Sequence, residues 1–475
     1  MLSFFITIPF LSLIVFNIPG KNSGRLAFFW SAALFFAQAV LVLLFSIGTI
    51  NPAAMQLSHI FVFKLAMDPL SSLLLLSIGI VAFVTLLAGN SLITETAQRN
   101  NFINLLMVAV TGMNATCLAA DLFSVYVFME IVAVSSFVLI SIQKDRLALE
   151  GAFKYMIMSS VATVLMLTSI ALIILTCGDT DFGVIVSGLA GQSGNPLAKL
   201  AIGLFLCGLF IKSGLVPFHG WLPDAYSAAS SPVSILLAGI ITKITGVYVL
   251  MRLVISVFGA NPVIQNLLMF VGTVSIIFGA LAALTQHDFK RMLAYSSISQ
   301  IGYIILGLGC GTPLGLAGAA FHFFNHAIFK SLLFVNAAAV EKQAGTVHMD
   351  NMGGLSARMP LTGTTSVIAL LSTAGIPPLA GFWSKLIIIM ALWSAGKFTY
   401  AYIAVIFSVV TLAYFLSMQR RVFFGKLQFG LEAVKEAGLG LTIPAALLAA
   451  ITLAAGIGFN WMLDKLILPI QAILR

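Results

Sequence analysis

The sequence contains little charge and few cysteines. Only 8% of its 475 residues are charged, whereas 60% are hydrophobic. This composition excludes a soluble globular domain of this length, and it predicts an all-α polytopic membrane protein. The formal net charge of +9 is expected to lie mostly in the connections at the membrane surface. No basic cluster is long enough to follow a phosphate backbone, so we expect no nucleic-acid partner.

The cysteines and short motifs give no sign of a cofactor. The cysteines form no CxxC or CxxCH pattern, so we expect neither an iron–sulfur cluster nor a haem nor a structural zinc site. The sequence also lacks a Walker loop and a strand–GxGxxG–helix unit. The energy for any transport must therefore come from an ion gradient or from partner proteins.

Apolar runs of spanning length predict about fourteen transmembrane helices. They lie at 2–19, 26–48, 67–88, 102–120, 122–142, 152–176, 198–217, 232–256, 263–284, 293–311, 314–340, 361–395, 399–418 and 441–462. No soluble domain interrupts them, so we expect a single membrane domain over 1–475.

Two of these runs are expected to be broken helices. The seventh contains Gly214 and Pro217, and the twelfth contains Gly375-Ile-Pro-Pro-Leu-Ala-Gly381 and is too long for one straight span. A broken helix exposes backbone polar groups, so it is tolerated in a membrane only against protein or a water-filled cavity. Several transporters place their binding sites at such breaks.

The positions of the two breaks predict an inverted repeat. They lie five spans apart, and because five is odd the repeats would enter the membrane from opposite sides. We predict one repeat at 102–256, spans four to eight, and the other at 263–418, spans nine to thirteen. The alternative is two unrelated kinks, but a lysine beside each break, Lys212 and Lys385, favours the repeat.

The distribution of Lys and Arg predicts the orientation. Most of them lie in the odd-numbered connections, as Arg420 and Arg421 do. By the positive-inside rule, these connections are cytoplasmic and both termini lie outside the cytoplasm, in the inner (plasma) membrane of the cell. The even-numbered connections and the termini contain fewer, which are Lys64, Lys199, Arg252, Lys397, Lys465 and Arg475.

Two opposite charges are expected deep in the membrane. Lys212 lies inside an apolar run, where a charge costs about 3 kcal/mol or more. Glu130 lies at the middle of the fifth span, and an ionised carboxylate there needs a cation. We therefore expect the two to pair. The alternatives are a lysine that extends toward the membrane surface and a neutral glutamic acid bonded to a backbone carbonyl.

Further ionisable residues predict a proton relay. Lys243 lies near the middle of the eighth span. In the eleventh span, the spacing of His322, His326 and Lys330 places them on one helix face, about 6 Å apart. Such a row is typical of proton pathways in membranes. A metal site at the two histidines is the alternative, although no third ligand is evident and Lys330 would repel a cation.

Other polar residues have weaker signals. His219 and Asp224 follow the seventh span and either gate proton uptake from the cytoplasm or cap helices. A set of residues in the tenth span either holds water or provides small-residue helix packing; it comprises Ser296, Ser297, Ser299 and Gln300.

Four segments, in the same order, resemble the proton-conducting antiporter-like subunits of complex I, of membrane-bound hydrogenases and of Mrp-type sodium/proton antiporters. The resemblance covers nearly the whole chain. The segments are Ile211-Lys-Ser-Gly-Leu-Val-Pro-Phe-His-Gly-Trp-Leu-Pro-Asp-Ala225, Asp288-Phe-Lys-Arg-Met-Leu-Ala-Tyr-Ser-Ser-Ile-Ser-Gln-Ile-Gly-Tyr303, Asn325-His-Ala-Ile-Phe-Lys330 and Gly375-Ile-Pro-Pro-Leu-Ala-Gly-Phe-Trp-Ser-Lys385.

The resemblance implies a role for each buried charge. Glu130 and Lys212 would form a switching ion pair. Lys243 and the His322/His326/Lys330 row would form a central hydrated relay, and Lys385 would end it. Some members have a glutamate at the position of Lys385, and the largest complex I member has a long lateral helix that this chain lacks. The subfamily stays open.

The sequence thus predicts a non-redox, proton-translocating subunit of a complex I-type (NADH-quinone oxidoreductase) or hydrogenase-type respiratory complex. Its partners would be other membrane subunits, the lipid bilayer, protons and, in one version, sodium. A subunit of an Mrp-type sodium/proton antiporter is the alternative. A membrane enzyme with a metal or quinone site at His322 and His326, and a scaffold with vestigial charges, are further readings.

Overall fold

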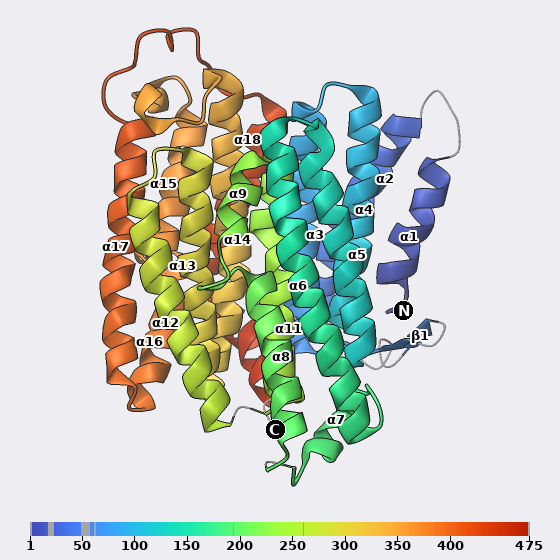
Figure 1. The fold of residues 1–475 in the computed structure, drawn as a ribbon. Coiled ribbons are helices and arrows are strands. Elements are labelled where there is room, and N and C mark those ends of the chain that lie inside the picture. Colours follow the sequence, from blue (N-terminus) through green and yellow to red (C-terminus); the bar gives the residue numbers. More distant parts are fainter. Residues whose placement is uncertain are drawn as a thin grey trace.

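The protein is a bundle of long, roughly parallel and antiparallel helices (Figure 1). The computed structural model describes residues 2–17, 23–48, 58–60, 63–192, 194–259 and 261–473. In this described part, twelve helices are long and apolar enough to cross a membrane, and α1 and α16 are shorter apolar helices. The prediction of an all-α polytopic membrane protein is confirmed, whereas the exact number of spans stays a prediction. Residues 18 and 19, at the end of the first predicted span, lie outside the described residues.

The first half of the chain runs to the end of the eighth predicted span, and its regular elements are α1 (Phe4–Phe16), α2 (Ser23–Ser46), β1 (Ser58–Ile60), β2 (Phe63–Leu65), α3 (Pro69–Leu92), α4 (Thr96–Leu118), α5 (Leu122–Ile140), η2 (Ser141–Gln143), α6 (Arg146–Cys177), α7 (Phe182–Leu189), α8 (Pro196–Ser213), α9 (Trp221–Ala228), α10 (Ser231–Leu236), η3 (Leu237–Ile241), η4 (Lys243–Tyr248) and α11 (Val249–Ser256). Both η3 and η4 are π-helical, so the eighth span is widened at its middle.

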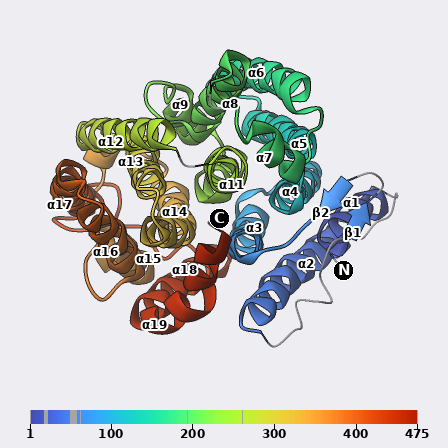
Figure 2. The same cartoon turned by 90° about the horizontal axis from the view of Figure 1, so that it is seen from below.

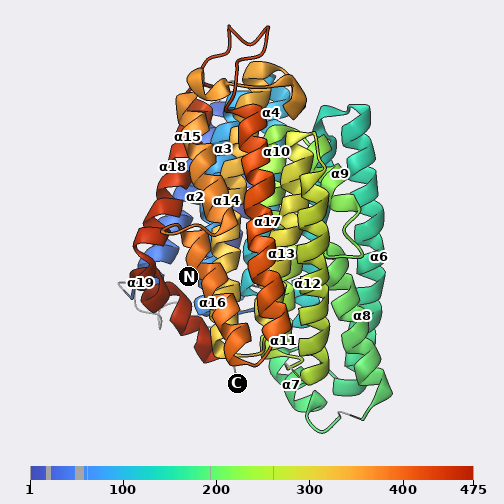
Figure 3. The same cartoon turned by 90° about the vertical axis from the view of Figure 1, so that its left-hand side faces the viewer.

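The second half comprises α12 (Pro262–Leu284), α13 (Phe289–Gly309), α14 (Pro313–Ala344), η5 (Met349–Asn351), η6 (Leu355–Ala357), α15 (Pro360–Ala374), α16 (Ala380–Ser394), α17 (Phe398–Val422), α18 (Leu439–Ile457), α19 (Phe459–Met462), η7 (Leu463–Ile467) and η8 (Leu468–Ile473). The connection at 423–438 lies at the upper end of the bundle and α7 lies at the lower end (Figures 1 and 3). We use these two names for the ends below.

The two spans that contain Lys243 and the predicted His322/His326/Lys330 row lie inside the bundle. Seen along the bundle in Figure 2, α11 and α14 occupy the middle, and α6, α12, α17 and α2 lie at the periphery. The span 231–256 and helix α14 are both buried along their apolar length. Their lysines and histidines are therefore surrounded by protein and not by lipid.

Several of the few acidic residues cap helices and so mark where spans begin. Each accepts a hydrogen bond from a backbone N–H of the first turn, which would otherwise lack a partner. The aspartates at the starts of α3, α5, α6, α7 and α13 do this, and they are Asp68, Asp121, Asp145, Asp181 and Asp288.

Both predicted broken helices are present. Helix α8 ends at Ser213 because Gly214 adopts a left-handed conformation with φ +65°, and α9 continues the span after a short turn. Helix α15 likewise ends before Gly375, where φ is +85°. A Cβ atom at Gly381 would lie 1.8 Å from the carbonyl oxygen of Ser372, so only glycine lets α16 pack this closely on α15.

The lower end contains two elements that the sequence did not predict, a two-stranded antiparallel sheet and the short helix α7. Strands β1 and β2 pair with each other, and Leu65 of β2 also bridges to Ala119 at the end of α4. Lys64 forms an ion pair of 2.7 Å with Asp181, the cap of α7. The sheet therefore links the start of α3 to the ends of α4 and α6.

Candidate functional site

The structure brings Glu130 and Lys212 together. The Lys212 Nζ atom donates hydrogen bonds to Glu130 Oε1 at 2.8 Å and to Ser159 Oγ at 3.0 Å. Thr163 Oγ1 donates to the same Glu130 oxygen at 2.8 Å. Lys212 lies in the last turn of α8, where the helix dipole also favours a positive charge. The ammonium group is thus held by one carboxylate, one hydroxyl and a helix end.

The two partners differ in their surroundings. The Lys212 side chain is 2% exposed, so it does not extend toward the membrane surface. The Glu130 side chain is 25% exposed, and Ile131 and Val134 on the same helix are exposed apolar residues. The carboxylate therefore lies at the lateral surface of this chain, where a neighbouring membrane protein can reach it.

Lys243 lies in the π-helical segment η4 and is fully buried. Its ammonium group donates a hydrogen bond to the carbonyl oxygen of Ala238. A Cβ atom at Gly246 would lie 2.6 Å from the Ser213 backbone, so η4 packs directly against the end of α8 that holds Lys212. In the described residues, no carboxylate lies within ion-pair distance of Lys243.

The predicted row on α14 is present and completely buried. The rings of His322 and His326 have centroids 6.3 Å apart and are parallel within 1°. Lys330 donates a hydrogen bond to the carbonyl oxygen of Leu293 at 3.1 Å and another to the hydroxyl of Ser296. Within the described ranges, no group of three His, Cys, Asp or Glu side chains has the geometry to hold a metal ion.

The row on α14 continues toward Lys385. His322 Nδ1 lies 2.9 Å from Ser384 Oγ, one residue before Lys385. Lys385 Nζ lies 3.3 Å from Ser408 Oγ and 3.5 Å from the carbonyl oxygen of Ala374, which the break after α15 leaves without a helical partner. The same ammonium lies 4.5 Å from the centroid of the Tyr303 ring, within the range of a cation–π interaction.

The two candidate gating residues contact different partners. Asp224 Oδ2 and Oδ1 each form a 2.7 Å ion pair, with Lys154 and Arg291 respectively. It lines a cavity of about 810 Å³ at the upper end of the bundle. His219 instead packs against the ring of Phe278, with centroids 4.4 Å apart.

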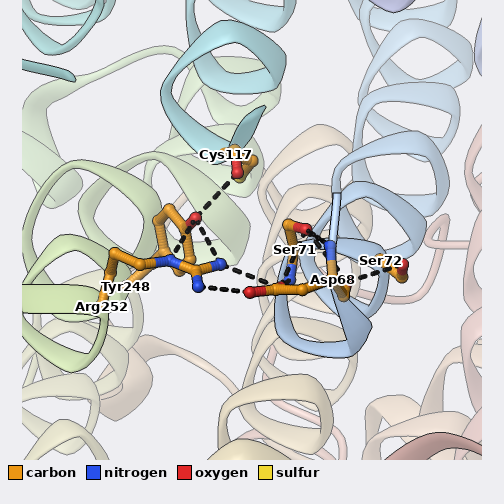
Figure 4. Close-up of polar contacts among 6 residues, drawn as sticks. All are labelled: Asp68, Ser71, Ser72, Cys117, Tyr248 and Arg252. Carbon is orange, nitrogen blue, oxygen red and sulfur yellow. Dashed lines mark hydrogen bonds and ion pairs between the residues drawn. The ribbon is translucent and has the colours of Figure 1, made fainter. Parts of the chain in front are cut away.

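Sequence reasoning missed one buried ion pair. The charge count predicts Arg252 in a connection, and this prediction is wrong because Arg252 lies inside α11 and its side chain is 12% exposed. Its guanidinium forms a bidentate pair with Asp68, with Nη2 2.9 Å from Oδ1, and it also donates to Tyr248 Oη (Figure 4). Tyr248 Oη in turn donates to the carbonyl oxygen of Cys117 at 2.8 Å.

The signal for this pair was present but ambiguous. Arg252 falls within the eighth apolar run, 232–256, and Asp68 falls within the third, 67–88. Both lie near the ends of those runs, so composition alone cannot distinguish a buried pair from two solvated charges. Only the packing of α11 against the start of α3 brings them together.

Comparison with known sequences places this geometry in a family. The model of the family described as "NADH:quinone oxidoreductase/Mrp antiporter, TM" matches residues 119–411. NADH-quinone oxidoreductase subunit N of Desulforudis audaxviator is 34% identical over 406 residues, which are 83% of this chain and 80% of the relative. One subunit of the Na(+)/H(+) antiporter of Alkalihalophilus pseudofirmus is 29% identical over 393 residues, which are 82% of this chain and 80% of the relative.

The fold is also similar to that of a solved membrane complex. A chain in the structure of the Mrp complex from Dietzia sp. DQ12-45-1b superposes with a TM-score of 0.92 at 24% sequence identity, and the match covers 100% of this chain and 97% of that one. The family match includes the first broken helix, the row on α14 and Lys385. The chain therefore belongs to the NADH:quinone oxidoreductase/Mrp antiporter transmembrane family.

Proposed function

We propose that this chain is the proton-translocating, non-redox subunit of a larger membrane complex. The observation that carries the proposal is a set of buried ionisable side chains that extends across the bundle. It starts at the Glu130–Lys212 pair, continues through Lys243 and the row on α14, and ends at Lys385. Charges at this depth are costly, so function is the best reason for their presence.

The geometry supports a specific sequence of events. While Glu130 contacts Lys212, the carboxylate stabilises the protonated ammonium group. When a neighbouring protein of the complex pulls the exposed side of Glu130 away, Lys212 loses its counter-charge and releases its proton toward Lys243. The proton then moves along Lys330, His326 and His322 to Lys385. No electron is exchanged in any of these steps.

The upper end is proposed as the cytoplasmic side. The basic residues Arg420 and Arg421 lie in the last turn of α17, at the upper end, and by the positive-inside rule they support this assignment. The cavity lined by Asp224 opens at this end and provides a route for proton uptake. Both termini would then lie outside the cytoplasm, in the inner membrane, and the inverted repeat over 102–256 and 263–418 would supply one half-channel each.

Two kinds of complex fit the proposal. The match to NADH-quinone oxidoreductase subunit N supports a redox-driven complex, of the complex I or hydrogenase type. The match to an Na(+)/H(+) antiporter subunit supports an Mrp-type assembly, in which sodium is exchanged for protons. Sodium prefers oxygen ligands, and Glu130 is the carboxylate of the relay, so we favour protons as the ion that this chain itself moves.

The proposal is tested with the assembled complex in sealed vesicles. Glu130→Gln should reduce proton translocation at least tenfold, since loss of a charged partner of this kind costs more than about 1.4 kcal/mol. Glu95→Gln, at an exposed acid before α4, should leave translocation unchanged. Normal pumping by Glu130→Gln would refute the proposal, and omission of sodium from the buffers separates the two kinds of complex.

A further inference from the structure

Helix α13 presents polar side chains along the same face that contacts the relay row on α14. The Ser296 hydroxyl contacts Lys330, and the Tyr303 ring lies 5.8 Å from the His322 ring. The two helices are antiparallel, because only residues 310–312 join them. The contacts at both ends therefore fix the register between the helices.

This register places Gln300 level with His326. Gln300 lies one turn after Ser296 and one turn before Tyr303, and His326 lies one turn from both Lys330 and His322. Both side chains are 0% exposed. Among the described residues, neither the two amide atoms of Gln300 nor the two ring nitrogens of His326 have a hydrogen-bond partner.

The hydroxyl of Tyr414 is a third polar group beside Gln300. Tyr414 is on α17, and its hydroxyl lies beside Ser296 and Gln300, within reach of a hydrogen bond to either side chain. Buried polar atoms without partners each cost about 1–3 kcal/mol. The two amide atoms of Gln300 and the two ring nitrogens of His326 are four such atoms, and with the Tyr414 hydroxyl they form a polar site from three helices. Such a site suits a water molecule, which makes two to four hydrogen bonds when it is buried.

The relay itself needs a bridge at this level. The ring centroids of His322 and His326 are 6.3 Å apart and their planes are parallel, so the two rings are too far apart for a direct hydrogen bond. Lys330 is one helical turn from His326, and its ammonium group bonds to the Leu293 carbonyl oxygen and to Ser296. A proton can cross such a gap only through an intervening hydroxyl or water.

We infer that Gln300, with Tyr414, binds an ordered water between α13 and α14 that hydrogen-bonds to His326 and connects the two halves of the row. The inference rests on the proposed function. In the transfer step, the water oxygen accepts a proton from the Lys330 ammonium group and gives one of its own protons to a His326 ring nitrogen. One N–H bond of Lys330 and one O–H bond of the water break, while a new O–H bond of the water and an N–H bond of His326 form, so Lys330 becomes neutral and His326 becomes positively charged. Gln300 is a positioning residue, because its amide keeps its own protons.

The first test is a map of the intact complex that resolves ordered water. The inference expects density within hydrogen-bond distance of both Gln300 and His326, and it expects that density to disappear in Gln300→Leu. A direct hydrogen bond between the two side chains, or dry apolar packing around them, would overturn it. This measurement is independent of transport, so it also decides the water site if the unsubstituted complex moves no protons.

The second test measures translocation per assembled complex in vesicles. Gln300→Leu should reduce the rate about tenfold, which corresponds to the loss of one bridging hydrogen bond. Gln300→Glu keeps a group that can hold water and should restore most of the rate, which a purely structural role would not predict.

The matched control is Gln38→Leu. Gln38 is also a buried glutamine, but its amide bonds to Asn114 and to the Leu75 carbonyl oxygen, far from the relay. This variant should weaken packing and leave the rate per assembled complex unchanged. Equal rates for Gln300→Leu and the unsubstituted complex would contradict the inference.

Discussion

Two of the ion pairs in the described part of the chain, Asp68–Arg252 and Glu130–Lys212, differ in how firmly each charge is held. In the Asp68–Arg252 pair, both carboxylate oxygens accept from the guanidinium, Nε and Nη2 also donate to Tyr248, and Asp68 also caps α3. In the Glu130–Lys212 pair, the hydrogen bonds from Lys212 and Thr163 converge on a single oxygen, Oε1. The first pair therefore engages both oxygens of its carboxylate, whereas in the second the hydrogen bonds from Lys212 and Thr163 engage only one, as the proposed switching role of that pair requires.

The chemistry of the two cations agrees with this difference. A guanidinium group stays protonated under all conditions that a cell meets, so Arg252 can hold segments together but cannot pass a proton on. A lysine ammonium changes its protonation state readily when it is buried and its counter-charge moves. The chain thus uses arginine where the ends of α3, α4 and α11 are joined, and lysine at both ends and in the middle of the proposed relay.

The largest effect is expected when the cation of the Glu130–Lys212 pair is changed. Lys212→Arg keeps the positive charge and the contact with Glu130, but the guanidinium does not release its proton. Proton translocation by the assembled complex should therefore fall about a hundredfold, as for loss of a general acid–base group. The measurement is the initial rate of vesicle acidification, normalised to the amount of complex.

Lys199→Arg is the matched control, because Lys199 lies near the start of the same helix and is exposed. It should pump normally. If Lys212→Arg also pumps at a normal rate, the lysine is a structural cation and the difference between the two pairs has no functional meaning.

The reciprocal change in the Asp68–Arg252 pair should affect stability and not transport. Arg252→Lys replaces a planar fork of donors by one ammonium group, which cannot bond to both Asp68 oxygens and Tyr248 at once. We expect a loss of about 1–3 kcal/mol in the free energy of unfolding, from the hydrogen bonds that are no longer made. The measurement is the thermal unfolding midpoint of the purified complex.

Translocation per assembled Arg252→Lys complex should stay within about twofold of normal, a change of less than about 0.5 kcal/mol in the barrier. A large loss of transport with unchanged thermal stability would contradict the structural role of this pair.

The sequence predicted the parts of the site that depend on local rules. The breaks follow from Gly214 and Gly375, since glycine adopts the left-handed conformation that ends a helix without strain. The row on α14 follows from spacings of four residues. The pairing of Glu130 with Lys212 follows from the cost of an isolated charge in a membrane.

The features that it did not predict depend on tertiary packing. Asp68 and Arg252 are 184 residues apart in the chain and meet only because α11 ends beside the start of α3. The π-helical turns around Lys243 have no sequence signature that we could apply, although such turns are frequent at functional sites. The roles of the relay residues and the inverted repeat stay predictions until transport is measured.

The smallest effect of a substitution is expected at a third ion pair, Lys64–Asp181, which is more exposed than the other two. Lys64 and Asp181 join β2 to α7 at the lower end, with side chains 50% and 24% exposed. The hydrogen bond from Lys64 lowers the pKa of Asp181 most, and it outweighs the partial burial that raises this pKa. A carboxyl group whose pKa is lower in the folded state stabilises that state above its unfolded pKa of about 3.9, and this contribution is lost as the pH falls through the folded pKa.

The measurement compares the thermal unfolding midpoints of the unsubstituted complex and of Asp181→Asn as the pH is lowered. Asparagine can still cap α7, so the comparison isolates the charge. The difference should be small at neutral pH, smaller still in high salt, and absent in strong acid, because water and ions screen an exposed pair. A difference that persists in strong acid would show that the contribution comes from packing and not from charge. The different effects of substitution at the three ion pairs would then have to be explained by burial alone, and not by which cation can release a proton.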